Sequence, residues 1–551
     1  MPSGILSGNI NQYGDIDECL QAEAKYCLTY LNIKLSGTES HVLHTVHTLM
    51  HSHHAFRSTP QDPGHRVPRY SSMHWGVCVP KSCAPEDVEN SLKKFADSVT
   101  QGTGLKATVQ VNPEMCQVQT NEGLPYSTKF VGCLFLGLIC LAAMATVYDF
   151  MDNKKDQKGL GNEILLAFSL KKNSQKLFSL DVPADDISSI HGIRLFNAVM
   201  LYFSHKSMAI FYNPYMNRTA MAEALGKPWT VIARAASLYT DPFIMMSGLL
   251  TAYSLGRQMQ KHQKIDVMRE IASRLLRLMP TLGGLILFCT FILPYMGSGP
   301  QWPLVINHHA EICKNHWWRN MLFIHNYFGF KNMCLTHTHH IGIDTQLFMV
   351  SPLLVYIVYR WPKQGLWTLL TIGLLSTVLR FYTSYIMQLN LVSQMFNTAD
   401  YSYILPTHRA SVYVMGIALG YLLRQLGRDV KLKSGHLTLG WFIAFAMLYQ
   451  SMIQPSKMGS RFYVYDRMDA ANYAAFAPIT WCLFFSWIIF TSHTGNGGII
   501  SKLASWRGFQ ISTRLAYTFY LTQFPVFFYN VGRVRHTDTY SLQLLVKSFI
   551  I

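Results

Sequence analysis

The sequence carries little charge for its length. Only 14% of its 551 residues are Asp, Glu, Lys or Arg, and half are hydrophobic, whereas soluble domains carry about 25% charged residues. The charge is also uneven, because residues 1–128 are polar and most later residues fall into apolar runs. Many of these runs reach the length of about 20 residues that a bilayer-spanning helix needs. The scarcity of charge therefore excludes a soluble globular chain.

The sequence also lacks the short motifs of several enzyme classes. It has no Gly-rich phosphate loop, no Gly-x-Ser-x-Gly turn and no His-Glu-x-x-His pair. It has no basic face interleaved with aromatic residues, so the net charge of +17 does not indicate nucleic-acid binding. The basic residues fall mainly between apolar runs, where they report membrane topology. We predict membrane lipids as partners and no nucleic acid.

The start of the chain, Met1-Pro2-Ser3-Gly4, has no basic or apolar stretch, so no signal peptide is visible. Clustered cysteines in the polar N-terminal region indicate an oxidising compartment and disulfides, which we assign to Cys19, Cys27, Cys78 and Cys83. With Cys116 the region has an odd number of cysteines. The missing signal peptide and the odd number of cysteines are both explained if the natural chain begins upstream, with a signal sequence and another cysteine. The end inside an apolar run indicates that the chain is clipped there too.

Ten apolar segments are predicted to span the membrane as helices, and an eleventh begins near residue 541. The predicted fold class is all-α: a polytopic helical membrane bundle of ten or more spans with a small disulfide-stabilised N-terminal domain. We expect this domain over 1–128, a first transmembrane helix with a linker over 129–189, and a transmembrane domain over 190–551. The ten segments are 130–148, 190–211, 231–255, 278–296, 341–359, 365–387, 408–423, 437–453, 472–490 and 513–530.

The orientation follows from the basic residues in alternate loops, since one set of loops holds about twenty Lys and Arg and the other about eight. The basic set should be cytosolic, which places residues 1–129 in the lumen or the extracellular space. The sequon Asn217-Arg218-Thr219, a predicted glycosylation site, falls on the same outer side. Cys313 and Cys334 also lie there, and a disulfide between them would contribute roughly 3 kcal/mol. Plasma membrane and endoplasmic reticulum both stay open.

Charged groups inside a spanning helix are costly and therefore indicate function. Arg194 and His205 lie eleven residues apart in the second segment, on one helix face and about 16 Å apart along the axis. They predict a polar track that leads inward from the cytosol. Asp241 in the third segment should reach a similar depth and orient the imidazole of His205. The alternative is that Asp241 pairs with an arginine of the bundle, namely Arg194, Arg409 or Arg514.

Arg274 and Arg277 stand at the cytosolic mouth of the fourth segment, with Pro280 suited to a helix start. Arginines three residues apart are neighbours on a helix and suit phosphate recognition. Topological anchoring explains them equally well. The histidines within 41–54 and 337–340 could bind zinc, but no cysteine or carboxylate is interleaved among 41–54, and we predict no metal site.

Taken in order, these residues resemble the nose resistant to fluoxetine family, the animal branch of the acyltransferase family 3 membrane proteins. Residues 7–9, 13–19, 26–27 and 75–83 resemble the extracellular domain of that family. Arg194 with His205 matches the Arg-x10-His motif of the wider family, and Arg274 with Arg277 its Arg-x-x-Arg motif. Further matches are Asp241 to Gly248, Cys313, Trp317, Trp318, Cys334, Asp344, Gln346, Arg409, Gly416, Gly420, Arg514, Tyr517 and Tyr520.

The resemblance implies an O-acyltransferase for groups other than amino-acyl groups. The acyl group would pass from acyl-CoA, as co-substrate, to a hydroxyl of a lipid, sterol-like or glycan acceptor, and no bound cofactor is implied. His205 would be the general base, a role worth about 10²–10⁴ in rate. Arg194 would stabilise the donor or the developing oxyanion, and Arg274 and Arg277 would hold donor phosphates.

Two other functions use the same polar residues. The first is a transporter or uptake protein for lipids or small amphipathic molecules. The second is a receptor-like protein with a relict site, whose outer domain binds an extracellular lipid carrier. The sequence departs from the family pattern at Lys206 after the proposed base, at His337-Thr338-His339-His340 in place of Trp, and at Gln523 in place of His.

Overall fold

A computed structural model describes most of the chain. The described residues are 9, 11–35, 72–119, 123–151, 159–181, 183, 185–210, 213–217, 220–221, 224, 227–389, 399–428, 430–459, 465–541 and 543. The predicted features that lie outside them are the histidines within 41–54, the sequon residues Arg218 and Thr219, and the apolar end over 544–551.

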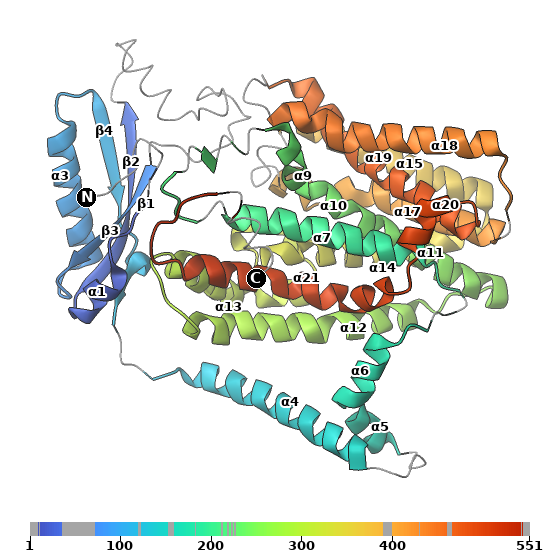
Figure 1. Cartoon of the computed structure of the whole chain (residues 1–551), viewed down its shortest axis with the longest axis horizontal. Coiled ribbons are helices and arrows are strands. Elements are labelled where there is room, and N and C mark those ends of the chain that lie inside the picture. The colour runs from blue at the N-terminus through green and yellow to red at the C-terminus, as the bar shows by residue number, and fades with distance from the viewer. Residues whose placement is uncertain are drawn as a thin grey trace.

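The N-terminal domain contains a five-stranded sheet (Figure 1). β1 (Asn11–Gln12) runs parallel to β3 (Ser72–Val79), which pairs antiparallel with β2 (Lys25–Leu35); β4 (Leu105–Gln110) and β5 (Cys116–Val118) both pair antiparallel with β2. Helix α1 (Ile16–Gln21) follows β1, and α3 (Pro85–Thr100) packs on β2 and β4. The all-α prediction is therefore wrong for this domain. The β-branched and aromatic residues of Lys25–Leu35 favour a strand.

Two disulfides hold this sheet together. Cys19 in α1 bonds to Cys78 in β3, and Cys27 in β2 bonds to Cys116 in β5. Cys83 is a free thiol, so its assignment to a disulfide is wrong in this structure. The reason is strand register, since Cys27 and Cys116 lie directly opposite each other in neighbouring strands, whereas Cys83 lies in the turn between β3 and α3.

The rest of the chain is a helical membrane domain. Six helical segments of the described residues are long and apolar enough to cross a membrane, which makes this an integral membrane protein. The prediction of ten or more spans is not confirmed. The six segments are Tyr126–Met151 (α4), Val267–Tyr295 (beginning with α12), Thr336–Arg360 (including α14), Pro362–Ile386 (α15), Ser434–Met458 (beginning with α18) and Arg467–His493 (α19).

Four further helices among the described residues are slightly shorter, with 21–24 residues against 25–29, and more polar. They are α7 (Ser189–Ile210), α11 (Asp241–His262), α17 (Pro406–Leu426) and α21 (Phe509–Gly532). These helices carry most of the polar residues discussed below, which is why their hydropathy is low. Helices α11 and α17 are largely buried inside the bundle.

The sheet domain lies at one end of the bundle, and α5 (Leu160–Ala167), α6 (Leu170–Phe178) and α20 (Gly498–Ala504) lie at the other, which we call the far end (Figure 1). Asp17 of the domain forms an ion pair of 2.9 Å with Arg535 after α21. The Gln117 amide donates a hydrogen bond of 3.1 Å to the carbonyl of Gly299. Figure 1 shows α4 running obliquely, apart from the bundle for most of its length.

Two helices begin elsewhere than predicted. Helix α11 begins at Asp241, because Pro242 occupies the first turn, where its missing N–H costs nothing. Asp241 is thus at a helix start and not ten residues inside a span. Helix α12 begins at Val267, capped by the Asp266 side chain, and Pro280 lies within it. Both arginines of the Arg-x-x-Arg motif are therefore inside a helix.

The disulfide pattern predicts a difference in thiol reactivity. In unreduced protein a maleimide reagent should modify Cys83, and should modify Cys27 and Cys116 only after reduction, as peptide mapping by mass spectrometry can show. Cys116→Ser should lower the free energy of unfolding of the domain by about 2–5 kcal/mol. Cys83→Ser is the matched control and should have a much smaller effect. Modification of Cys116 without reduction would contradict this pairing.

Candidate active site

Helices α7 and α21 lie side by side and run in the same direction (Figure 1). The Tyr202 ring of α7 lies between two phenylalanines of α21, with centroid distances of 5.5 Å to Phe519 and 5.3 Å to Phe527. Gly192 lets α20 cross the start of α7, because a Cβ there would lie 2.4 Å from the Ala504 carbonyl oxygen. These contacts fix the helix that carries both Arg194 and His205.

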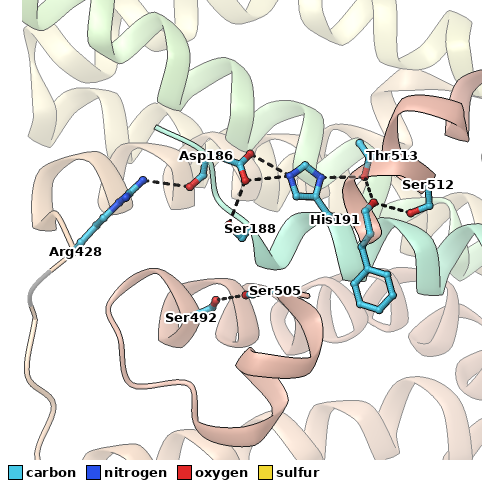
Figure 2. A network of polar contacts seen from close by, with 9 residues as sticks. Asp186, Ser188, His191, Arg428, Ser492, Ser505, Ser512 and Thr513 are labelled. Carbon is cyan, nitrogen blue, oxygen red and sulfur yellow. Dashed lines mark hydrogen bonds and ion pairs between the residues drawn. The ribbon is translucent and has the colours of Figure 1, made fainter. Parts of the chain in front are cut away.

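A polar network ties α7 to α21 at the far end (Figure 2). The His191 ring lies between Asp186, 3.1 Å from its Nε2, and the Thr513 hydroxyl, 3.0 Å from its Nδ1. Burial raises the pKa of Asp186, but the contacts with His191 and Ser188 and the charge of Arg194 together hold that pKa below its usual value. Arg194 lies three residues beyond His191, so the network fixes its position.

Arg194 is partly buried, and the structure brings it near the Arg-x-x-Arg motif of α12. Its charge interacts with those of Arg277, Asp344 and Asp186. Arg277 is exposed. Two guanidinium groups from different helices thus lie near each other, an arrangement that suits an anionic ligand.

Arg274, by contrast, is already occupied by protein groups. It forms an ion pair with Asp344 of α14 and donates a hydrogen bond of 3.2 Å to the Ser247 hydroxyl of α11. Its guanidinium also lies over the Phe348 ring, 4.2 Å from the centroid. Arg274 therefore joins three helices, and of the two motif arginines only Arg277 is exposed to a ligand.

His205 is partly buried and presents a ring nitrogen without a partner. Its Nδ1 has no hydrogen bond to protein, the Gln523 side chain interacts with the ring, and the Phe524 ring packs edge-on at 4.6 Å. Gln523 thus lies beside the histidine, at the position where the family pattern has His. An imidazole with a free nitrogen lone pair can accept a proton, as a general base must.

Further histidines, from the segment 337–340, lie near this site. The His337 ring stacks on the Phe524 ring, with a centroid distance of 4.6 Å and an interplanar angle of 7°. Electrostatic interactions link His205 to His337, His339 and His340. Their signal in the sequence was the departure at 337–340. No group of three or more His, Cys, Asp or Glu in the part of the chain that the structure describes could hold a metal ion.

Asp241 does not pair with His205. It forms an ion pair with Arg409 of α17, and both side chains are 0% exposed. Arg409 also donates a hydrogen bond of 3.2 Å to the Tyr403 carbonyl and lies over that ring at 4.3 Å. The expected Asp–His pair is therefore wrong, and the alternative of an arginine partner is correct. The reason is that α11 begins at Asp241, so its carboxylate meets the start of the neighbouring helix α17.

Three other predicted features take up definite positions. Cys313 and Cys334 form a disulfide. Arg514 donates hydrogen bonds to the carbonyls at the end of α6, including those of Lys176 and Leu177 at 2.6 and 2.7 Å. The Asn217 amide exchanges two hydrogen bonds with the backbone of residue 540, at 2.6 and 3.0 Å. These bonds occupy the nitrogen that a glycan would take, and glycosylation stays a prediction.

The structure so far defines a class: an integral membrane protein with a disulfide-bonded domain at one end of its bundle and an Arg–His helix inside it. Residues 187–550 match the family described as "Acyltransferase domain", and residues 1–92 match "Nose resistant-to-fluoxetine protein, N-terminal domain". The chain belongs to the nose resistant to fluoxetine group of the acyltransferase family 3 membrane proteins.

Two curated relatives, both from Caenorhabditis elegans, support this assignment. "Nose resistant to fluoxetine protein 6" is 22% identical over an alignment of 607 residues that covers 97% of this chain and 71% of the relative. "Regulator of hypoxia-inducible factor 1" is 27% identical over 150 residues, 26% of this chain and 28% of the relative. No solved structure matches the chain.

The buried ion pair predicts a large effect on stability. Asp241→Asn should lower the free energy of unfolding by about 3–5 kcal/mol, because it leaves the charge of Arg409 buried without its carboxylate. The double variant Asp241→Leu/Arg409→Met should lose less, since neither charge remains. Thermal unfolding of the protein in detergent measures both. Equal stability of Asp241→Asn and the parent protein would contradict the pairing.

Proposed function

We propose that this protein is an O-acyltransferase that moves an acyl group from acyl-CoA to a hydroxyl of a membrane lipid or another amphipathic acceptor. The observation that carries the proposal is the free Nδ1 of His205, held on the same helix as Arg194. The acyltransferase domain of the family supports the reaction class.

The reaction assigns one proton transfer to His205. Its free ring nitrogen accepts the proton of the acceptor hydroxyl while the hydroxyl oxygen attacks the thioester carbonyl. The carbon–sulfur bond breaks, the CoA thiolate leaves, and the imidazolium returns the proton to the sulfur. Because no carboxylate contacts His205 in the described residues, its orientation rests on Gln523 and Phe524.

The two arginines suit the donor end of the track. Arg194 is about 16 Å from His205 along the helix axis, so its side chain is too short to reach an oxyanion formed beside the imidazole. Its neighbour Arg277 is exposed. We therefore assign Arg194 and Arg277 to the CoA phosphates, and assign the span between Arg194 and His205 to the thin pantetheine arm.

The orientation proposed for the chain follows the donor. Acyl-CoA is cytosolic, so the far end with Arg194 would face the cytosol and the disulfide-bonded domain would face the lumen or the extracellular space. The larger number of Lys and Arg in the loops of the far end supports this orientation. A glycan on Asn217 would agree with it.

The absence of a carboxylate at His205 favours a second candidate, a non-catalytic protein. In the described residues Asp241 is bound to Arg409 and Asp344 to Arg274, so neither strengthens the base. The same polar helices would then form a path for a lipid or small amphipathic molecule, or a relict site beneath a domain that binds a lipid carrier. Transport without acyl transfer is the outcome that supports this candidate.

The acyltransferase proposal predicts the loss of label transfer in two variants. Protein reconstituted with lipid extract and radiolabelled acyl-CoA should produce labelled lipid. His205→Ala should reduce the rate by about 10²–10⁴, and Arg194→Ala should chiefly raise the KM for acyl-CoA. The matched controls are His436→Ala and Arg360→Ala, both exposed positions away from the site. Flux of lipid across vesicles without label transfer, unchanged in His205→Ala, would support the transporter instead.

A further inference from the structure

A second arginine lies buried beside the Asp241–Arg409 pair. Arg380 on α15 is 2% exposed, compared with 0% for both members of the pair. Its charge interacts with both Asp241 and Arg409. Nevertheless, Arg380 forms no ion pair with any carboxylate among the residues that the structure describes. The site belongs to three helices, α11, α15 and α17.

Several hydrogen-bonding atoms in this region have no partner. They include three donors, Nε and Nη2 of Arg380 and Nη2 of Arg409, and one acceptor, Oδ2 of Asp241. The Ser384 hydroxyl is also unpaired and 0% exposed, and it lies one helical turn from Arg380 on the same face of α15. Buried donors are almost always satisfied, and charged donors are the most costly to leave unmade. The three guanidinium donors and the Ser384 hydroxyl outnumber the one free carboxylate oxygen, so they need a further acceptor.

The charges do not balance either. Arginine stays protonated in proteins, so two guanidinium groups face one carboxylate. The other titratable groups that interact with Arg380 or the pair are neutral in their ordinary protonation states at pH 7: Tyr403, Tyr473, Cys482 and the histidines His339, His340 and His408. An uncompensated charge in the interior of a membrane bundle is strongly unfavourable. One monovalent anion would satisfy both the charge and the donors.

We propose that Arg380, Arg409 and Ser384 bind a small inorganic anion, chloride under cellular conditions, as a fixed part of the fold. The burial of all three side chains favours an ion over a lipid headgroup, because a lipid needs an open path from the site to the bilayer for its chains. Guanidinium and hydroxyl donors suit a halide. The proposal does not depend on acyl transfer, since the anion holds three helices together whatever the protein catalyses.

The test is the anion dependence of thermal unfolding in the detergent-purified full chain. In sodium gluconate, titration with chloride or bromide at constant ionic strength should raise the apparent Tm by about 3 °C or more, because the ion binds the folded state alone. Binding of radioactive chloride, measured by scintillation proximity, should saturate over the same concentrations.

Two variants should remove this response. Arg380→Met removes the uncompensated charge, and Ser384→Asp supplies a carboxylate one turn away. Each variant should therefore have the same Tm in chloride as it has in gluconate. Arg360→Gln, on the exposed end of α14, is the control and should keep the full response. A parent protein with equal Tm in both salts, or a persistent response in Arg380→Met, would overturn the proposal. Stabilisation by inorganic phosphate or phosphatidic acid but not by chloride would also overturn it.

Discussion

The close approach of α11 and α17 is the constraint on which the rest of the membrane domain depends. Gly416 and Gly420, one turn apart on α17, touch the backbone of α11, since a Cβ on either would lie 2.0 Å from the Met245 carbonyl oxygen or 2.3 Å from that of Leu249. Gly248 makes the reciprocal contact with the Tyr413 carbonyl. Small residues at this spacing let membrane helices pack backbone to backbone. The Asp241–Arg409 ion pair then fixes the register of the two helices.

The polar residues of the bundle have two separate roles: some join helices, and others form the candidate site. Asp241, Arg409 and Arg274 join helices, and each forms an ion pair with another protein side chain. His205 and Arg194 lie on a different helix, α7, which is held by aromatic contacts with α21 and by the His191 network. The reactive groups are thus positioned by packing, and the buried ion pairs support the scaffold against which they pack.

Much of the membrane domain was predictable, because apolar length alone marks a spanning helix. The exact helix starts were not, since the local rule for proline is ambiguous: Pro242 begins a helix, but Pro280 lies within one, where neighbouring helices compensate for its missing donor. The partner of Asp241 depends on where α11 begins, because a start at Asp241 brings its carboxylate to Arg409. The assignment of Cys83, and not Cys116, to a disulfide was wrong for a similar reason, because strand register is a tertiary property.

The candidate site was predictable along α7, where helical periodicity places Arg194 and His205 on one face. The histidines at 337, 339 and 340 were not, because they appear in the sequence as part of a loop. In the fold His337 stacks on Phe524, the same ring that packs against His205. Gln523 shows the same limit. Its departure from the family pattern was visible in the sequence, but its contact with His205 requires α7 and α21 to be side by side.

Acyl-CoA binding along α7 can be tested with a cryo-electron microscopy map of the protein bound to a non-hydrolysable acyl-CoA thioether. We expect density for the phosphates at Arg194 and Arg277 and for the thioether sulfur beside the free nitrogen of His205. Density for the ligand on another surface, or none within hydrogen-bonding reach of His205, would contradict this binding.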